Sequence, residues 1–210
     1  VSTDKAVSPF NTYGATKFLM ERLLVSANFY KGSHDVKFFC VRYGNVLGSS
    51  GSIVPTFVNQ IQEGKKITVT DPTMTRFTTT MNQAVDLILR ALTNGTGGEL
   101  FIPKLKSYRV GDVKDAIMEL MNSNVETVIT SVRPGEKYHE SLINMDEIRY
   151  TYENKDDYII FDEQVQNHKL KDGSAIKSNL KHQYSSDKVE LLTKEEIKEI
   201  LLREKLVPVL

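Results

Sequence analysis

The chain has 210 residues, of which 40% are hydrophobic and 26% are charged, enough for one sizeable globular core or two small ones. Its 27 basic residues balance 27 acidic ones, so no chain-wide field favours nucleic acid or an anionic membrane surface. This composition argues against global disorder and indicates neither a nucleic-acid partner nor a membrane partner.

The first part of the chain alternates helix and strand. Residues 13–27 are predicted to form a helix, and residues 37–43 a buried strand. Residues 53–63 are predicted to form a helix closed by Gly64, and residues 67–70 a short strand. A helix followed by a strand is a unit of an α/β fold.

The alternation continues through the middle of the chain. Helices are predicted over residues 81–92 and 110–121, and strands over residues 99–102 and 126–130. Residues 141–145 are interpreted as a further helical turn. The pattern favours an α/β fold with a mostly parallel sheet and a smaller capping region.

Beyond about Tyr150 the chain becomes richer in charged and polar residues, and the apolar run of residues 158–161 is isolated. We expect a strand over that run, followed by an irregular or partly disordered segment as far as residue 188. Residues 193–204 are predicted to form a capped amphipathic helix that packs on the domain or on a partner subunit.

The single cysteine, Cys40, has no second cysteine for an intramolecular disulfide, which fits a reducing compartment. We interpret it as a buried, packed side chain rather than a reactive thiol. The four histidines are scattered without ligand spacing, so no metal site is expected. Because the sequence has no window of about 18 apolar residues and no N-terminal signal pattern, we expect a cytoplasmic protein.

Tyr13 and Lys17 form one cluster of reactive side chains. If this segment is helical, positions four apart lie on one face, and the Lys17 ammonium can approach the Tyr13 phenol. A phenol with a pKa near 10 is a poor base at neutral pH, and a neighbouring cation favours its ionised form. Tyr13 could then take a proton from a substrate hydroxyl while a hydride leaves the same carbon. The alternative is a chance spacing on an amphipathic helix.

The residues Thr3-Asp4-Lys5 form a second cluster. On an extended segment Asp4 and Lys5 would point to opposite sides, but at a strand end or turn both can reach one cleft. A protonated carboxyl group can act as a general acid, and a neutral amine as a general base. The alternative is a solvated turn in which Asp4 caps a neighbouring segment. Together the two clusters indicate an enzyme that acts on an alcohol.

A series of motifs in this order resembles the extended short-chain dehydrogenase/reductase superfamily. The segments that carry the resemblance are Val1-Ser2-Thr3-Asp4-Lys5-Ala6, Pro9, Tyr13-Gly14-Ala15-Thr16-Lys17, Arg42-Tyr43-Gly44-Asn45-Val46 and Gly48-Ser49-Ser50-Gly51-Ser52, with a weaker echo at Tyr184-Ser185-Ser186. Within the superfamily, Met74-Thr75-Arg76-Phe77 and Arg133-Pro134-Gly135-Glu136-Lys137 resemble the UDP-N-acetylglucosamine 4,6-dehydratases of the inverting kind.

The resemblance implies a partial Rossmann-like parallel sheet with a smaller C-terminal substrate-binding region. Residues 1–50 would hold the catalytic helix and strand, residues 51–150 a nucleotide-sugar-binding region interleaved with further Rossmann elements, and residues 151–210 a C-terminal tail and helix. No Gly-x-x-Gly-x-x-Gly turn precedes Thr3. We therefore expect a fragment that lacks the first β/α units and by itself binds nicotinamide cofactor poorly.

The resemblance also implies a role for each reactive residue. Tyr13, assisted by Lys17 and Thr3, would deprotonate the sugar 4-hydroxyl as its hydride passes to NADP, with NAD as the alternative cofactor; Tyr13 and Lys17 would also contact that cofactor. Lys5 would then remove the C5 proton while Asp4 protonates the departing 6-hydroxyl. Hydride return to C6 and reprotonation of C5 on the opposite face would give UDP-2-acetamido-2,6-dideoxy-β-L-arabino-4-hexulose, which begins pseudaminic acid synthesis.

The same resemblance assigns the recognition of UDP-N-acetylglucosamine to Asn45, Arg76, Arg133 and Glu136. Arginines offer forked donors for phosphate oxygens, and Glu136 can accept from ribose hydroxyls. Alternatively, Arg133 forms a surface ion pair with Glu136 or Glu140, and Arg76 only decorates a strand. A homo-oligomer is expected, as in relatives.

Lys5 discriminates between related activities. Dehydratases that act on dTDP-glucose carry Asp-Glu where this chain has Asp4-Lys5, and the large membrane-bound relatives usually carry Met in place of Tyr13. A UDP-sugar 4-epimerase would use Tyr13 and Lys17 in the same way but would not need Lys5. A non-catalytic, truncated nucleotide-sugar-binding or assembly module is the remaining alternative.

Overall fold

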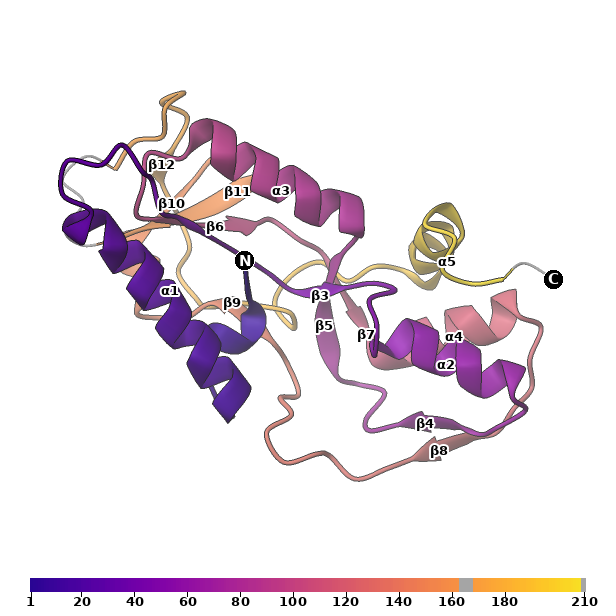
Figure 1. Ribbon diagram of the computed structural model, residues 1–210. Helices are drawn as coiled ribbons and strands as arrows, with labels where there is room; N and C mark the ends of the chain where they lie inside the picture. Colours follow the sequence, from indigo (N-terminus) through magenta and orange to yellow (C-terminus); the bar gives the residue numbers. More distant parts are fainter. Residues whose placement is uncertain (163–167, 209–210) are drawn as a thin grey trace. The chain divides into compact units, whose positions relative to one another are not determined.

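The computed structural model describes residues 1–162 and 168–208 (Figure 1). The chain divides into two compact units, each of which is described by itself. Unit 1 is composed of Val1–Gly44, Asn82–Lys104 and Ser141–Ser185, and unit 2 of Asn45–Met81, Leu105–Glu140 and Ser186–Leu210. Each unit therefore combines segments that are far apart in the sequence. The functional division into residues 1–50, 51–150 and 151–210 stays a prediction.

Unit 1 is built on a six-stranded sheet with the strand order β1-β2-β6-β11-β10-β12. The strands are β1 (Ser2–Thr3), β2 (Cys40–Tyr43), β6 (Glu99–Pro103), β10 (Thr151–Glu153), β11 (Asp157–Phe161) and β12 (Ile176–Lys177). β1, β2 and β6 are parallel, whereas β11, β10 and β12 extend the sheet with antiparallel pairs. The predicted α/β class is confirmed. The expectation of a mostly parallel sheet is corrected, because three of the five strand pairs of this sheet are antiparallel.

The helices of unit 1 cover this sheet and supply its core. They are α1 (Thr12–Tyr30), α3 (Met81–Asn94) and the 3-10 helices η1 (Asp4–Ala6) and η2 (Glu147–Tyr150). Leu87 and Ala91 of α3 pack with Phe101 of β6 and Phe161 of β11, all of them buried. The helices predicted over residues 13–27 and 81–92 are confirmed. The buried face of α3 is apolar, with Ala84, Leu87 and Ala91, whereas α1 buries Gly14, Glu21 and Val25.

The expectation of a helical turn in unit 1 needs correction. Residues 141–145 do not form a helical turn; Ser141–Ile143 is strand β9, which pairs with β13 (Tyr184–Ser185). Leu142 and Ile143 are fully buried, so tertiary packing decides the conformation of this short segment. The segment before residue 188 was expected to be irregular or partly disordered. Residues 163–167 lie outside the described residues; residues 168–188 are irregular apart from the two-residue strands β12 and β13, and Leu170 and Tyr184 in this segment are buried in the fold.

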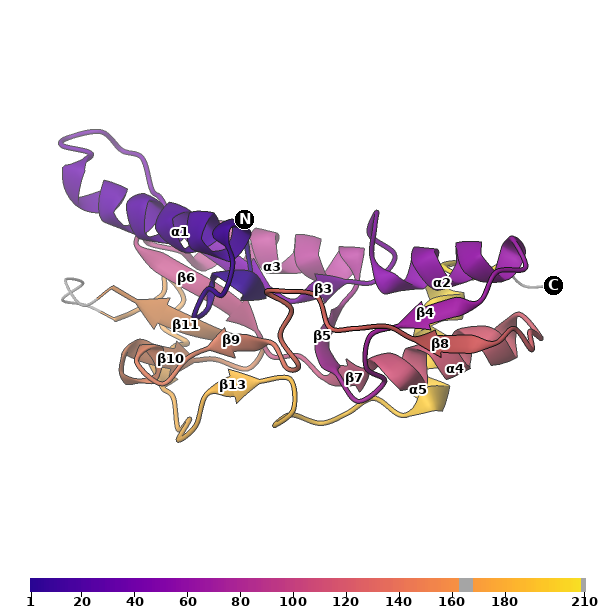
Figure 2. The same cartoon turned by 90° about the horizontal axis from the view of Figure 1, so that it is seen from below.

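Unit 2 combines three helices with two small sheets. Its elements are β3 (Asn45–Val46), α2 (Ile53–Gln62), β4 (Ile67–Val69), β5 (Thr75–Thr79), β7 (Ser107–Arg109), α4 (Val110–Leu120), β8 (Thr127–Ile129) and α5 (Lys194–Arg203). β3, β5 and β7 form one sheet, and β4 pairs with β8, as Figure 2 shows. Phe57, Ile67, Ile117 and Leu201 meet in the core. Neither β5 nor β7 was among the predicted strands, although one interpretation of Arg76 placed it on a strand. Every residue of β5 is buried, and its sequence does not alternate.

A capping box fixes the start of α5, as the sequence predicted. The Glu196 N–H donates to the Thr193 hydroxyl at 3.2 Å, and the Thr193 N–H donates to the Glu196 carboxylate at 2.8 Å. The helix then buries Ile197 and Leu201.

Replacing Thr193 by alanine is expected to lower the free energy of unfolding by about 1 kcal/mol, because the first turn of α5 loses its side-chain acceptor. Urea denaturation measures the change. Ser52→Ala is the matched control, since Ser52 stands before α2 without a side-chain capping bond. An equal loss in both variants would show that the capping box contributes nothing specific.

Candidate active site

The two reactive clusters meet in unit 1 where β1, η1 and α1 adjoin. Thr3 lies opposite Tyr43 in the parallel pair of β1 and β2, and the chain turns directly from β1 into η1. Asp4 and Lys5 therefore stand at a strand end, as predicted. At the start of α1, a Cβ on Gly14 would overlap the carbonyl oxygen of Lys5. The glycine thus lets the helix that carries Tyr13 approach η1 closely, a role that was not predicted.

Replacing Gly14 by alanine is expected to push α1 away from η1 and to destabilise the fold by about 1–3 kcal/mol, as overpacking does. The added methyl group meets backbone, which cannot rotate aside as a side chain would. Denaturation with urea checks this. The control is Ala15→Ser at the adjacent exposed position, expected to stay within about 0.5 kcal/mol. Equal stability of the Gly14→Ala variant would mean that the two segments are not in close contact.

Asp4 contacts both of its neighbours in the Thr3-Asp4-Lys5 cluster. Its side chain is fully buried, and Oδ1 accepts hydrogen bonds from the Thr3 hydroxyl at 2.8 Å and the Lys5 ammonium at 3.1 Å. Oδ2 is also buried and makes no hydrogen bond within the described part of the chain. The Lys5 side chain is 35% exposed, so the amine can face both Asp4 and a ligand. A proton can therefore pass between these two groups or from either of them to a bound substrate.

Tyr13 and Lys17 lie on one side of α1. The Lys17 ammonium lies 5.9 Å from the centroid of the Tyr13 ring, within the range of a cation–π contact. The Tyr13 ring is 54% exposed. Partial burial, and then the charge of Tyr13, raise the pKa of Tyr43 above its usual value. Tyr13 therefore lies near the strand end at which Tyr43 pairs with Thr3.

The candidate substrate-binding residues belong to unit 2. Asn45 in β3 lies opposite Thr78 in β5, and Arg76 is two residues before Thr78. Because side chains two apart on a strand share a face, Asn45, Thr78 and Arg76 are on one face of the β3-β5-β7 sheet. The Asn45 Oδ1 and the Thr78 hydroxyl are buried and have no hydrogen-bond partner among the described residues. Thr78, which shares this face with Asn45 and Arg76, was not predicted as a site residue.

Arg76 is engaged within the protein. It is 9% exposed, and its guanidinium donates to the carbonyl oxygens of Thr75 at 2.8 Å and Tyr138 at 3.0 Å. A longer contact of 3.5 Å reaches the Glu136 carboxylate. Arg76 therefore holds the segment around Glu136 against β5, and a phosphate-binding role for it remains a proposal.

Arg133 and Glu136 stand at the two ends of a tight turn. The Glu136 N–H donates to the Arg133 carbonyl at 3.0 Å, and Gly135 supplies the positive φ of 84° that such a turn requires. Arg133 is exposed and takes part in none of the ion pairs of residues 1–162 and 168–208. The alternative of a surface ion pair with Glu136 or Glu140 is therefore not what the structure shows.

The remaining candidates for chemistry are the thiol of Cys40 and clusters of metal-ligating side chains. Burial raises the pKa of Cys40 to about 11, and the thiol is buried as interpreted. Within residues 1–162 and 168–208, no group of three or more His, Cys, Asp and Glu side chains could hold a metal ion. In the same part of the chain no helix is long and apolar enough to cross a membrane.

Comparison with curated proteins gives relatives of two activities. The UDP-N-acetylglucosamine 4,6-dehydratase (inverting) of Campylobacter jejuni is 42% identical over 161 residues, which is 76% of this chain and 47% of that protein. The UDP-glucose 4-epimerase of Rickettsia rickettsii is 37% identical over 204 residues, which is 96% of this chain and 60% of that protein. The protein named uncharacterized membrane protein MJ1061 of Methanocaldococcus jannaschii is 42% identical, with the same two coverages of 96% and 60%.

A solved structure extends the likeness to the fold. The X-ray structure of Pen from Bacillus thuringiensis has a TM-score of 0.86 and 38% identity, and the match covers 99% of this chain and 61% of that one. The resemblance to the inverting dehydratases within their superfamily is thus confirmed. The family described as polysaccharide biosynthesis protein matches residues 1–162. Because that match covers most of the 210 residues, the chain belongs to the polysaccharide biosynthesis protein family.

Proposed function

We propose that the protein is a UDP-N-acetylglucosamine 4,6-dehydratase that inverts C5, uses NADP or NAD, and works in the cytoplasm on a precursor of a pseudaminic acid-type surface glycan. One observation carries the proposal: the Lys5 ammonium contacts the buried Asp4 carboxylate directly beside the start of the helix that bears Tyr13 and Lys17. An acid, an amine and a phenol at one place are what oxidation followed by loss of water requires.

Tyr13 and Lys17 suit a nicotinamide nucleotide. The partly buried Lys17 ammonium has three N–H donors for ribose hydroxyls, and the exposed Tyr13 phenol can face the reacting carbon. When bound, the nicotinamide would accept the hydride from C4 and later return it to C6.

The residues of this chain perform the proton transfers. Tyr13 takes the proton of the 4-hydroxyl as C4 is oxidised, with the Lys17 ammonium beside its ring. The 4-ketone acidifies the neighbouring C5–H bond, and Lys5 removes that proton. Asp4 donates a proton to the 6-hydroxyl, which leaves as water. Reprotonation of C5 on the opposite face inverts that centre.

Asn45, Arg76, Arg133 and Glu136 are proposed to bind the UDP moiety. Arg133 supports this most directly, because its side chain is exposed and its forked donors match phosphate oxygens. Assembly into a homo-oligomer is also proposed, since α1 leaves Leu19 and Leu23 more than half exposed. Sedimentation of the intact protein tests that assembly.

A 4-epimerase acting on a UDP-sugar is the second candidate, favoured by the Rickettsia relative, which matches 96% of the chain. Both reactions begin at Tyr13 and Lys17, but a 4-epimerase does not need the Lys5 amine. Mass spectrometry after incubation with UDP-N-acetylglucosamine separates them. The dehydratase gives a product lighter by one water, and the epimerase an isomer of unchanged mass.

A non-catalytic binding or assembly module is tested by calorimetry with UDP and with NADP. Binding of UDP and NADP supports the enzyme. Binding of neither by the intact protein would count against any catalytic role.

A further inference from the structure

Arg42 lies fully buried in β2 between two carboxylates. Its Nε and Nη2 donate to the two oxygens of Glu21 at 3.0 and 2.5 Å, and its Nη1 and Nη2 donate to the two oxygens of Glu147 at 3.0 and 2.8 Å. Nη1 also donates to the Leu142 carbonyl at 2.8 Å. Every nitrogen of the guanidinium is therefore held in a fixed direction.

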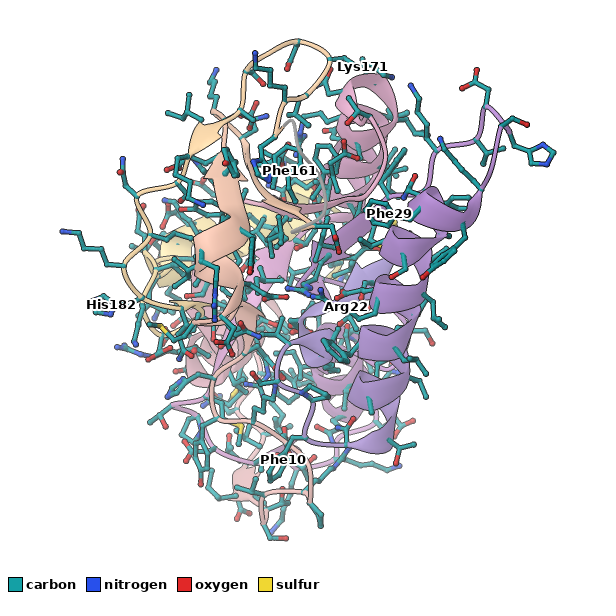
Figure 3. All side chains as sticks on the ribbon, turned by 90° about the vertical axis from the view of Figure 1, so that its left-hand side faces the viewer. Phe10, Arg22, Phe29, Phe161, Lys171 and His182 are labelled. Carbon is teal, nitrogen blue, oxygen red and sulfur yellow. The ribbon has the colours of Figure 1, made fainter. Side chains whose placement is uncertain are left out.

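The charges of this network balance within unit 1. Glu21 is 1% and Glu147 8% exposed at the side chain, and the two carboxylates are matched by Arg42 and by Arg22 of α1, which lies 3.5 Å from Glu147. Arg22 is labelled on α1 in Figure 3. Burial alone would lower the pKa of Arg42, but Glu147 and then Glu21 raise it well above its usual value. The guanidinium stays charged, and so its five hydrogen bonds are all charge-assisted.

The network joins the catalytic helix to the strand beside the Asp4 cluster. Glu21 follows Lys17 by four positions and Tyr13 by eight, so the three side chains descend one side of α1. Arg42 lies opposite Ser2 in the pair of β1 and β2, one residue before the partner of Thr3. The elements that carry both halves of the candidate active site thus share one buried cation.

The opposite side of the network is equally well fixed. Glu147 opens η2, its N–H donates to the Asn144 side chain at 2.9 Å, and its carboxylate accepts from the Asn144 N–H at 3.1 Å. Arg42 therefore joins Glu21 to a carboxylate that is itself hydrogen-bonded to Asn144.

Stability alone is a poor explanation for this arrangement. A buried ion pair often stabilises a fold no better than apolar side chains of the same volume, because both charges must leave water. What a forked guanidinium adds is direction. Close contact of Gly14 with η1 holds α1 near its start, and Glu21 holds it two turns later. A helix fixed at two such points cannot rotate about its axis.

We infer that Arg42, Glu21 and Glu147 are positioning residues that set the rotation of α1 and hence the place of the Tyr13 phenol relative to Lys5 and Asp4. The effect on turnover rests on the proposed function. The effect on the environment of Tyr13 does not.

Glu21→Gln tests the inference in the intact protein. Glutamine has the same shape, but its NH2 group faces an N–H donor of Arg42, so the paired geometry is lost while Glu147 still neutralises the cation. We expect kcat to fall roughly 10²-fold with KM close to that of the wild type, because the phenol is misplaced rather than removed. The NMR signal of the Tyr13 ring, assigned with Tyr13→Phe, is expected to shift.

Asp157→Asn is the matched control. Asp157 is 1% exposed and forms a two-bond pair with Arg90 of α3, at 2.8 and 2.7 Å, in the same unit but on a different helix. The Asp157→Asn variant should lose about as much stability in urea denaturation as Glu21→Gln, while its kcat and its Tyr13 signal stay as in the wild type.

Several outcomes would overturn the inference. One is an unchanged Tyr13 signal in Glu21→Gln. Another is a shift of that signal and a fall in kcat in Asp157→Asn equal to those in Glu21→Gln, because lost stability would then explain both effects. If the wild type modifies no nucleotide sugar, the proposed function fails and the Tyr13 signal alone decides. If Glu21→Gln does not fold, Glu147→Gln is measured in its place, with the same shift expected.

Discussion

Replacing Tyr13 by phenylalanine is expected to abolish reduction of the cofactor in the intact protein, with a loss of turnover of roughly 10²–10⁴-fold, the usual contribution of a general base. The reason is chemical rather than structural. The ring is 54% exposed, so we expect the loss of its hydroxyl to leave the fold intact while removing the group proposed to take the 4-hydroxyl proton.

The absorbance of reduced cofactor after addition of UDP-N-acetylglucosamine measures this effect. Tyr30→Phe is the control, because Tyr30 ends the same helix and is 86% exposed. It should behave as the wild type. Persistence of the signal in Tyr13→Phe would show that another base does the work.

Replacing Lys5 by alanine is expected to stop the loss of water while leaving oxidation at C4 in place. Lys5 lies 3.1 Å from Asp4 and is the partly exposed member of the pair, so it is the group placed to take the C5 proton. Reduced cofactor should therefore form and persist, because no C5–C6 alkene is made to receive the hydride.

A second variant separates the charge of Lys5 from its basicity. Lys5→Arg keeps a cation beside the buried Asp4, but a guanidinium does not lose its proton in proteins, so elimination should stop here too. Lys65→Ala, at an exposed ion pair of unit 2, serves as the control. Unchanged turnover of Lys5→Ala would reject the assignment of the C5 base.

The sequence predicted the elements that have strong local patterns. The helix over residues 53–63 and the capped helix at Thr193 have apolar faces and clear ends. The first is observed one residue shorter than predicted, at its C-terminal end, and the second one residue shorter at each end. The turn at Asp4 and Lys5 and the shared side of Tyr13 and Lys17 were also predictable, because they follow from spacing along a short segment.

Contacts between distant segments could not be predicted in this way. Arg42 bonds to Glu147, 105 positions later, and nothing in either local pattern signals the partner. The same holds for β9, whose three residues form a strand because they pair with β13, and for Arg76, whose donors meet the Tyr138 carbonyl 62 positions away. The polar partners of buried arginines are set by topology, which a linear motif does not contain.

The most direct test of the central proposal is an NMR spectrum of the product that the intact protein forms from UDP-N-acetylglucosamine in heavy water. The proposal predicts a 4-keto sugar with a methyl group at C6, deuterium at C5 and inverted configuration at that carbon. A product that keeps its 6-hydroxyl and carries no deuterium at C5, with C4 inverted instead, would contradict it.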